Sequence, residues 1–145
     1  MLGRALAASL RTVLIGALAG FLTLGLGGRL AMWAFAEFTD RPNLVTPRGT
    51  LMVGLAGGIA GSIAAILYLL IARWLLPRAP TILRGLAFGA LTLLVASPGI
   101  RPPWPLTFAL FTPAFLLYGV LFVSAVVRFS RQEPVVMAQR NVEDP

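Results

Sequence analysis

Residues 49 to 72 read GTLMVGLAGGIAGSIAAILYLLIA, a run of 24 amino acids without a single charge. A helix that crosses the ~30 Å hydrocarbon core of a bilayer needs about 20 such residues. Thr46-Pro47 precedes the run, and a capping threonine followed by a proline is typical of a helix start. This stretch therefore predicts a membrane-spanning helix.

The rest of the 145-residue chain has the same character. It is 58% hydrophobic and 12% charged, which is about half the charged fraction of a soluble domain. Apolar runs separated by arginines and prolines predict four helices, over residues 8–37, 47–75, 82–97 and 105–128. We expect an all-α integral membrane four-helix bundle in a single domain, 1–128. The third run is short for a bilayer, so three crossings remain the alternative.

Arginine placement predicts the orientation of the helices. Every one of the 12 basic residues is Arg, and cytoplasmic loops of membrane proteins carry the excess of positive charge. Seven arginines fall on one side of the predicted bundle, namely Arg4, Arg11, Arg73, Arg78, Arg84, Arg128 and Arg131, and three on the other, Arg41, Arg48 and Arg101. We expect both termini in the cytoplasm, a multi-pass protein of the cytoplasmic membrane, and a flexible cytoplasmic tail over 129–145. Arginines between apolar runs face lipid headgroups, so the net charge of +7 does not predict nucleic acid as a partner.

A cleavable signal peptide is the competing interpretation of the N-terminus. Arg4 and Arg11 would form its basic region, and Ala34-Phe35-Ala36 resembles a cleavage site. The segment from Arg29 onward is longer and more apolar than the region that precedes a cleavage site. The composition therefore favours a helix that is retained.

Small residues recur at spacings of three and four on the first three predicted helices. Such spacings place residues on one helix face, and in lipid small residues let two helix backbones approach closely. We expect packing faces made by Gly16, Gly20, Thr23 and Gly27 on the first helix, by Gly54, Gly58, Ser62 and by Gly57, Gly61, Ala65 on the second, and by Gly85, Gly89, Thr92 and Ala96 on the third. The second helix carries two rows, which predicts a central position for it.

The fourth predicted helix carries large residues at the same spacing: Phe108, Phe111, Phe115, Tyr118 and Phe122. These rings could fill the shallow surfaces that glycines leave on the other helices, or they could face lipid. Dense packing of large against small residues favours the first interpretation.

Arg29 is the one charge between Thr12 and Ala36, the long apolar run of the first predicted helix. A charge at the bilayer centre costs about 2.5 to 3.5 kcal/mol on insertion scales, but Arg29 lies ~26 Å along the helix from Thr12, near the outer edge of the hydrocarbon. The simplest interpretation is an anchor at the outer interface. The alternative is a charge that attracts an anion or a lipid headgroup.

Side chains that could carry chemistry are nearly missing. The chain has no Cys and no His, and the apolar runs 12–36, 49–72, 85–100 and 102–127 contain no Asp, Glu, Asn, Gln or Lys. A proton-coupled transporter normally needs carboxylates or histidines inside the membrane, and a hydrolase needs a base beside its nucleophile. We therefore expect no enzyme activity, no metal site and no cofactor.

The stretches GGRLAMWAF (27–35) and PRGTLMVGLAGGIAG (47–61) resemble a pattern in uncharacterised small four-helix bacterial membrane proteins. That resemblance covers the first half of the chain and implies no known activity. The small four-helix fluoride channels are similar in length, in a Gly-rich first helix ending in Arg, and in a Gly-Thr-Leu start to the second. They carry Asn where Gly54 stands and a Thr/Phe-rich stretch that residues 85–97 lack, so fluoride conduction is not carried over.

The leading functional hypothesis is a non-enzymatic subunit of the membrane that acts by helix–helix association, either with copies of itself or within a larger complex. Two alternatives stay open. One is an oligomeric pore for a small anion or neutral solute, with Arg29 at its outer mouth. The other is an anionic-lipid-binding protein that uses the arginines of the cytoplasmic side.

Overall fold

The computed structural model describes residues 2–40, 46–71, 74, 78–99 and 105–143. Its elements are α1 (Leu2–Gly20), η1 (Phe21–Leu26), α2 (Gly27–Phe38), α3 (Pro47–Ile71), α4 (Thr81–Ala96), η2 (Ser97–Gly99) and α5 (Pro105–Glu143). Helices α1 and α2 continue into each other through η1, a π-helical turn, so they form one rod. The described part of the chain therefore contains four long helical segments and no strand, which confirms the all-α class.

Three of these segments are long and apolar enough to cross a membrane: Leu6–Phe38, Pro47–Ile71 and Pro105–Ser130. Helix α4 is apolar but has only 16 residues, about 24 Å at 1.5 Å per residue. Three helices thus have the length and apolar character that a multi-pass membrane protein needs, and α4 is the short segment that the sequence indicates.

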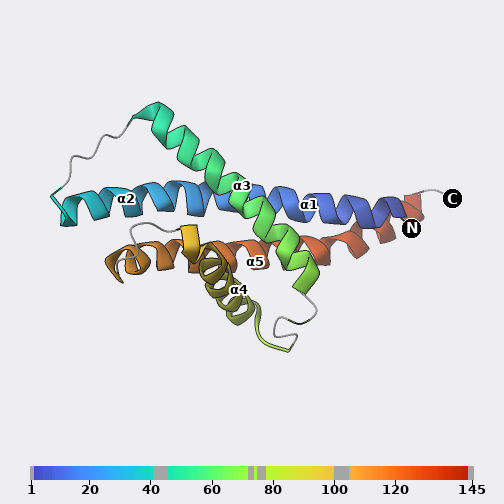
Figure 1. The fold of residues 1–145 in the computed structure, drawn as a ribbon. Helices are drawn as coiled ribbons and strands as arrows, with labels where there is room; N and C mark the ends of the chain where they lie inside the picture. The colour runs from blue at the N-terminus through green and yellow to red at the C-terminus, as the bar shows by residue number, and fades with distance from the viewer. Residues whose placement is uncertain (1, 41–45, 72–73, 75–77, 100–104, 144–145) are drawn as a thin grey trace.

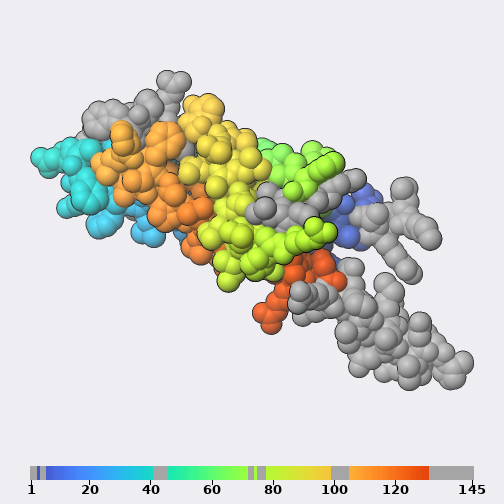
Figure 2. All heavy atoms as spheres, turned by 90° about the horizontal axis from the view of Figure 1, so that it is seen from below, coloured from blue at the N-terminus to red at the C-terminus, as the bar shows by residue number. Residues whose placement is uncertain are grey.

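Two crossed pairs make up the molecule (Figure 1). The rod α1–η1–α2 lies alongside α5 and runs in the opposite direction, while α3 crosses the rod and α4 crosses α5. Seen from below, α4 and the first half of α5 form one continuous face, with α2 at the end where α5 begins (Figure 2). The start of α1 and the end of α5 lie at the same end of the molecule.

Local chemistry explains where the described helices begin and end. The Thr46 hydroxyl accepts a hydrogen bond from the Gly49 backbone N–H at 3.1 Å, and Pro47 occupies the first helical position, where no N–H is needed. At the other boundary, Asp40 adopts φ 51°, a left-handed conformation that ends α2. Helix α3 therefore begins at Thr46-Pro47, as the sequence predicts.

Helix α5 continues to Glu143, beyond residue 128 where the sequence analysis ends the last helix and begins a tail. The stretch after Ser130 contains Gln, Glu, Met, Ala and Arg, all of which have high helix propensity. The polar composition of residues 129–145 predicts a tail. Polar residues keep a helix out of the lipid, but they do not prevent a helix from forming in water.

The core lies where the two crossed pairs meet. Ala65 of α3, Phe88 of α4 and Tyr118, Phe122 and Val123 of α5 are completely buried. Two of the five residues of the expected aromatic stripe, Tyr118 and Phe122, are thus buried, with ring centroids 5.7 Å apart in a stacked arrangement.

Tyr68 completes this aromatic core from α3. Its ring meets Phe88 and Phe122 edge-on, with centroid distances of 5.1 Å and 5.2 Å. Edge-to-face contacts of this kind stabilise a pair beyond the area that it buries. The core therefore joins α3 to the α4–α5 pair through rings rather than through close backbone approach.

Candidate functional site

Close backbone contact between α1 and α3 depends on glycines. A Cβ atom placed on Gly16 would lie 2.6 Å from the carbonyl oxygen of Gly61, and one placed on Gly57 would lie 2.7 Å from the Gly20 carbonyl oxygen and from the Gly25 Cα. Real Cβ atoms do not approach backbone atoms this closely, so no larger residue fits unless the helices separate. We call this contact the first glycine seam.

The π-helical turn η1 brings Gly25 into the first glycine seam. In a π-helix hydrogen bonds join residues five apart, so Gly20 and Gly25 share a face although an α-helix would turn them away from each other. The spacing of small residues predicts a packing face that continues from Gly20 through Thr23 to Gly27. In the structure, Gly27 instead faces α5, where its Cβ would lie 3.1 Å from the Cβ of Ala114.

A second glycine seam joins α4 to α5. A Cβ on Gly85 would lie 2.6 Å from the Val120 Cα, and one on Gly89 would lie 2.8 Å from the Leu116 Cα. Gly119 contributes from the α5 side, because its Cβ would lie 2.7 Å from the Gly89 Cα. The pattern of small residues does not predict a role for Gly119, because no other glycine lies in the same apolar run. A single glycine in an apolar helix can nevertheless indicate close approach of another helix.

Among the remaining small residues of α3, Gly54 belongs to the first glycine seam, because a Cβ placed on Gly25 would lie 2.7 Å from the Gly54 Cα, whereas Gly58 and Ser62 lie beside the seam. Gly54 is buried against Phe21, whose Cε2 would lie 2.7 Å from an added Cβ. Gly58 is half-buried, and its nearest neighbours to an added Cβ, the Ala17 carbonyl oxygen and the Phe21 Cβ, are at ordinary contact distances of 3.4 and 3.7 Å. Ser62 donates a hydrogen bond to the Gly58 carbonyl oxygen at 3.0 Å.

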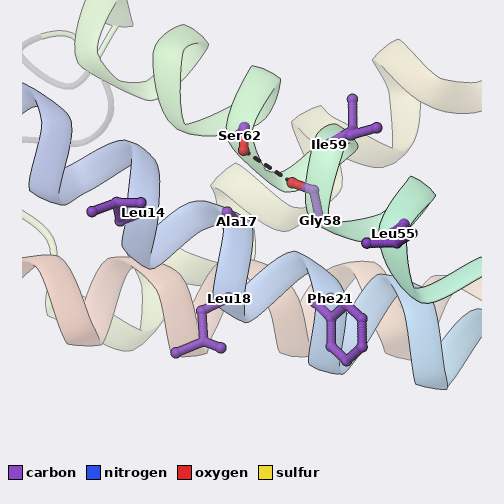
Figure 3. A pocket seen from close by; sticks show the side chains of 8 residues that line it. All are labelled: Leu14, Ala17, Leu18, Phe21, Leu55, Gly58, Ile59 and Ser62. Carbon is purple, nitrogen blue, oxygen red and sulfur yellow. Dashed lines mark hydrogen bonds between the residues drawn. The ribbon is translucent and has the colours of Figure 1, made fainter. Parts of the chain in front are cut away.

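Gly58 and Ser62, with Ala17 of α1, form the floor of an open groove between α1 and α3 (Figure 3). Its volume is about 460 Å³. The groove is lined by Leu14, Ala17, Leu18 and Phe21 from the rod and by Leu55, Gly58, Ile59 and Ser62 from α3. Small side chains occupy the floor and large ones the rims, an outline that suits a helix carrying bulky residues. We call it the α1–α3 groove.

The rims of the α1–α3 groove project strongly from the molecule. Leu14, Leu18 and Ile59 are 60%, 64% and 64% exposed. Lipid tails are as apolar as leucine, so exposure by itself indicates only that this face meets the membrane interior. The distinguishing feature is the recessed floor, because a partner helix gains van der Waals contact there that lipid on a flat surface does not.

Arg29 lies at the opposite end of the rod from the N-terminus. It is half-buried on α2, and its Nη2 would be 3.9 Å from a Cβ placed on Gly49 in the first turn of α3. The guanidinium thus reaches from α2 to the beginning of α3. Arg29 therefore lies where α2 meets the beginning of α3. Its role as an anchor at the outer interface of the membrane stays a prediction from the sequence.

Hydroxyl groups inside the bundle bond mostly to their own helices. Thr12 donates to the Ala8 carbonyl at 3.0 Å, Thr23 to Ala19 at 2.7 Å and Thr92 to Gly89 at 2.8 Å. Such local bonds satisfy a hydroxyl without creating a polar path. Across the described ranges, no group of three or more His, Cys, Asp or Glu residues lies together.

The Tyr118 hydroxyl bonds to another helix. It donates a hydrogen bond from α5 to the Gly61 carbonyl oxygen of α3 at 2.9 Å. The accepting carbonyl belongs to the first glycine seam, so this bond ties the two crossed pairs together. Sequence reasoning had no signal for the pairing, since the two residues lie 57 positions apart.

Comparison with protein-family models, with curated proteins and with solved structures finds no match to this chain.

Proposed function

We propose that this protein is a small multi-pass subunit of the cytoplasmic membrane that acts by pairing with a second copy of itself through the α1–α3 groove. The observation that carries the proposal is the recessed floor of Ala17, Gly58 and Ser62 between projecting rims. The glycines of the two seams are already used inside one copy, which leaves this groove as the small-residue surface open to another helix.

A second copy suits the groove because the groove contains its own complement. In a two-fold interface the same patch faces itself, so each ridge must find a recess on the partner. Leu14 and Leu18 lie four residues apart and form a ridge on α1, directly beside the floor that Gly58 and Ser62 form on α3. A two-fold rotation can therefore lay the ridge of each copy over the floor of the other.

The proposed topology has four crossings, with both termini in the cytoplasm. The start of α1 and the end of α5 lie at the same end of the molecule, which supports an even number of crossings. The bias of seven arginines against three supports a cytoplasmic location for that end. Helix α4 is the short crossing of this proposal.

Disulfide trapping tests the pairing, because the natural chain has no cysteine. Leu18→Cys and Ile59→Cys, made one at a time, each place a single thiol on a rim of the α1–α3 groove. We expect oxidation in native membranes to produce a covalent dimer from at least one of them. The matched control is Ile82→Cys, which puts an equally exposed thiol on α4, away from the groove, and is expected to stay monomeric.

A groove-filling variant completes the test. Gly58→Leu in the background of the cross-linking variant fills the floor and should remove the dimer, while leaving the seam residue Gly61 untouched. If no rim thiol forms a dimer, or if Ile82→Cys forms one equally well, pairing through the groove is wrong.

A further inference from the structure

We propose that an anionic phospholipid binds in a pocket between α1 and α5, with its phosphate group at Arg11 and its glycerol region against the apolar side chains of the same pocket. The pocket lies at the end of the molecule where α1 begins, which the arginine count predicts to face the cytoplasm. It shares no residue with the α1–α3 groove, so the proposal does not depend on the pairing of two copies.

The pocket combines charged, polar and apolar walls. Its volume is about 50 Å³, which is enough for a group of several heavy atoms because one water molecule needs roughly 10–15 Å³. It is lined by Ala8, Arg11, Thr12 and Ile15 from α1 and by Val126, Phe129 and Ser130 from α5. Thr12 is buried, whereas Arg11 and Phe129 are exposed. One pocket thus offers a guanidinium and apolar side chains together, which suits a ligand that has both a charged and an apolar part.

The position of this pocket along the two helices corresponds to the level of lipid headgroups. Ser130 is the last residue of the apolar span that begins at Pro105. On α1, Arg11 is the last charge before the apolar run that begins at Thr12. A helix passes from hydrocarbon into the headgroup layer where its apolar segment ends. A lipid of the surrounding leaflet therefore carries its phosphate at the depth of Arg11 without leaving its place in the bilayer.

Arg11 is the side chain of this pocket that can donate to a phosphate. Thr12 donates its hydroxyl hydrogen to the Ala8 carbonyl oxygen at 3.0 Å, and Ser130 donates its own to the Val126 carbonyl oxygen at 2.8 Å. The other lining side chains except Arg11 are apolar. A guanidinium has five N–H donors in a planar fork, so it can bind two phosphate oxygens and keep other contacts within the protein.

The charge of the chain around the pocket favours a lipid that carries a net negative charge. Segments 1–15 and 126–133 include the whole lining of the pocket, and their charged residues are Arg4, Arg11, Arg128 and Arg131 against Glu133. Clustered arginines at a membrane surface attract anionic headgroups. Such attraction acts over the whole basic surface, whereas the pocket offers one lipid molecule a defined place beside Arg11. Charge therefore selects the class of lipid, and the pocket selects the position.

Native mass spectrometry of the full chain in mild detergent tests this site. Phosphatidylglycerol and phosphatidylcholine with identical acyl chains are titrated in parallel. We expect the wild type to bind phosphatidylglycerol about tenfold more tightly, because the choline cation of phosphatidylcholine competes with Arg11 for the phosphate of its own headgroup. Arg11→Gln should remove most of that preference and leave the weaker binding of phosphatidylcholine unchanged.

Arg78→Gln is the matched control, because it removes the same charge at an exposed position outside the pocket lining. We expect it to change the affinity for phosphatidylglycerol by less than about threefold. Equal losses in Arg78→Gln and Arg11→Gln would mean diffuse attraction to the basic surface and would overturn the site. Equal binding of the two lipids by the wild type would do the same.

A second pair of variants keeps the proposal testable if Arg11→Gln fails to fold. Ala8→Trp fills the pocket from an exposed position while Arg11 stays in place, and Ala7→Trp puts the same side chain at an exposed position outside the lining. We expect Ala8→Trp to lower the affinity for phosphatidylglycerol by about tenfold and Ala7→Trp by less than about threefold. Equal affinities of these two variants would overturn the pocket. Displacement of phosphatidylglycerol by millimolar inorganic phosphate would identify a free-anion site and overturn the lipid assignment.

Discussion

At the scale of single residues, the two faces of α3 give glycine two different tasks. Gly61 lies in the first seam, where an added Cβ would stand 2.8 Å from the Gly20 Cα. Gly58, three residues earlier, has only ordinary contacts around the same added atom. Adding one methyl group at each of these two positions therefore separates the effect of close backbone approach on stability from the effect of the low helix propensity of glycine.

We predict that Gly61→Ala destabilises the protein by about 1–3 kcal/mol, because the methyl group must push α1 and α3 apart. The matched Gly58→Ala should be neutral or stabilising by up to about 1 kcal/mol, because alanine favours the helix more than glycine does. Unfolding in a graded mixture of mild and denaturing detergent, followed by circular dichroism, measures both. Similar free-energy changes at the two positions would contradict the seam.

The Tyr118 hydroxyl makes a buried hydrogen bond between the crossed pairs. Tyr118→Phe removes its 2.9 Å bond to the Gly61 carbonyl and keeps the buried ring. We predict a loss of about 1 kcal/mol, because the carbonyl retains its bond within α3 and hydrogen bonds in membranes are only modestly stabilising. Tyr118→Ala also empties the core and should cost about 3–5 kcal/mol. The same unfolding assay measures both variants. Equal losses of unfolding free energy would mean that the ring adds no stability beyond that of its hydroxyl.

Sequence spacing identifies only part of the seam residues. Gly16 and Gly20, like Gly57 and Gly61, stand four apart, and an α-helix places such residues on one face whatever the tertiary structure. Gly25 escapes this reasoning because it lies five residues after Gly20, and a π-helical turn is not visible in a hydrophobic pattern. The extra residue in the π-helical turn is therefore the reason why the sequence pattern does not predict the contact of Gly25 with α3.

At the scale of elements, η1 behaves as a one-residue insertion in a continuous helix. If residues 21–26 were α-helical, Gly25 would need to lie four residues after Gly20 to stay on the same face. Deleting one exposed residue from η1 gives that spacing. A deletion in α1 would instead rotate Gly16 away from α3.

We predict that deletion of Leu22, which is half-exposed in η1, is tolerated and leaves the thermal unfolding midpoint within a few degrees of the wild type. Deletion of Leu18, exposed on α1 between Gly16 and Gly20, should lower it far more or abolish folding. Thermal melts followed by circular dichroism compare the two. The same shift from both deletions would show that η1 is not an inserted residue.

The sequence predicts where the helices begin and end better than it predicts which helices pack against each other. Thr46-Pro47 predicts the start of α3 because the cap is local chemistry, and the short apolar run after Thr81 predicts a short α4. A row of small residues, by contrast, predicts a tight face without naming the helix that it meets. The α1–α3 groove exists because α3 crosses the rod, and no pattern within one helix predicts that crossing.

At the scale of the whole molecule, the remaining question is which ends of the helices face the cytoplasm. Single cysteines at exposed positions answer it, since the natural chain has none. Gly3→Cys and Trp74→Cys report on the end where α1 begins and α3 finishes, and Arg48→Cys and Pro105→Cys report on the opposite end.

We predict that a membrane-impermeant maleimide applied to intact cells labels the cysteines at positions 48 and 105 and not those at 3 and 74, because the arginine excess holds the latter end inside. After permeabilisation all four should react, which controls for burial. The position-105 thiol carries the argument about α4. If it is protected together with position 74 while position 48 is labelled, the 16-residue α4 does not carry the chain across. The chain then crosses three times and leaves its termini on opposite sides. Labelling at 105 means that a helix of ~24 Å, held against α5 by the second glycine seam, is long enough for the bilayer around it.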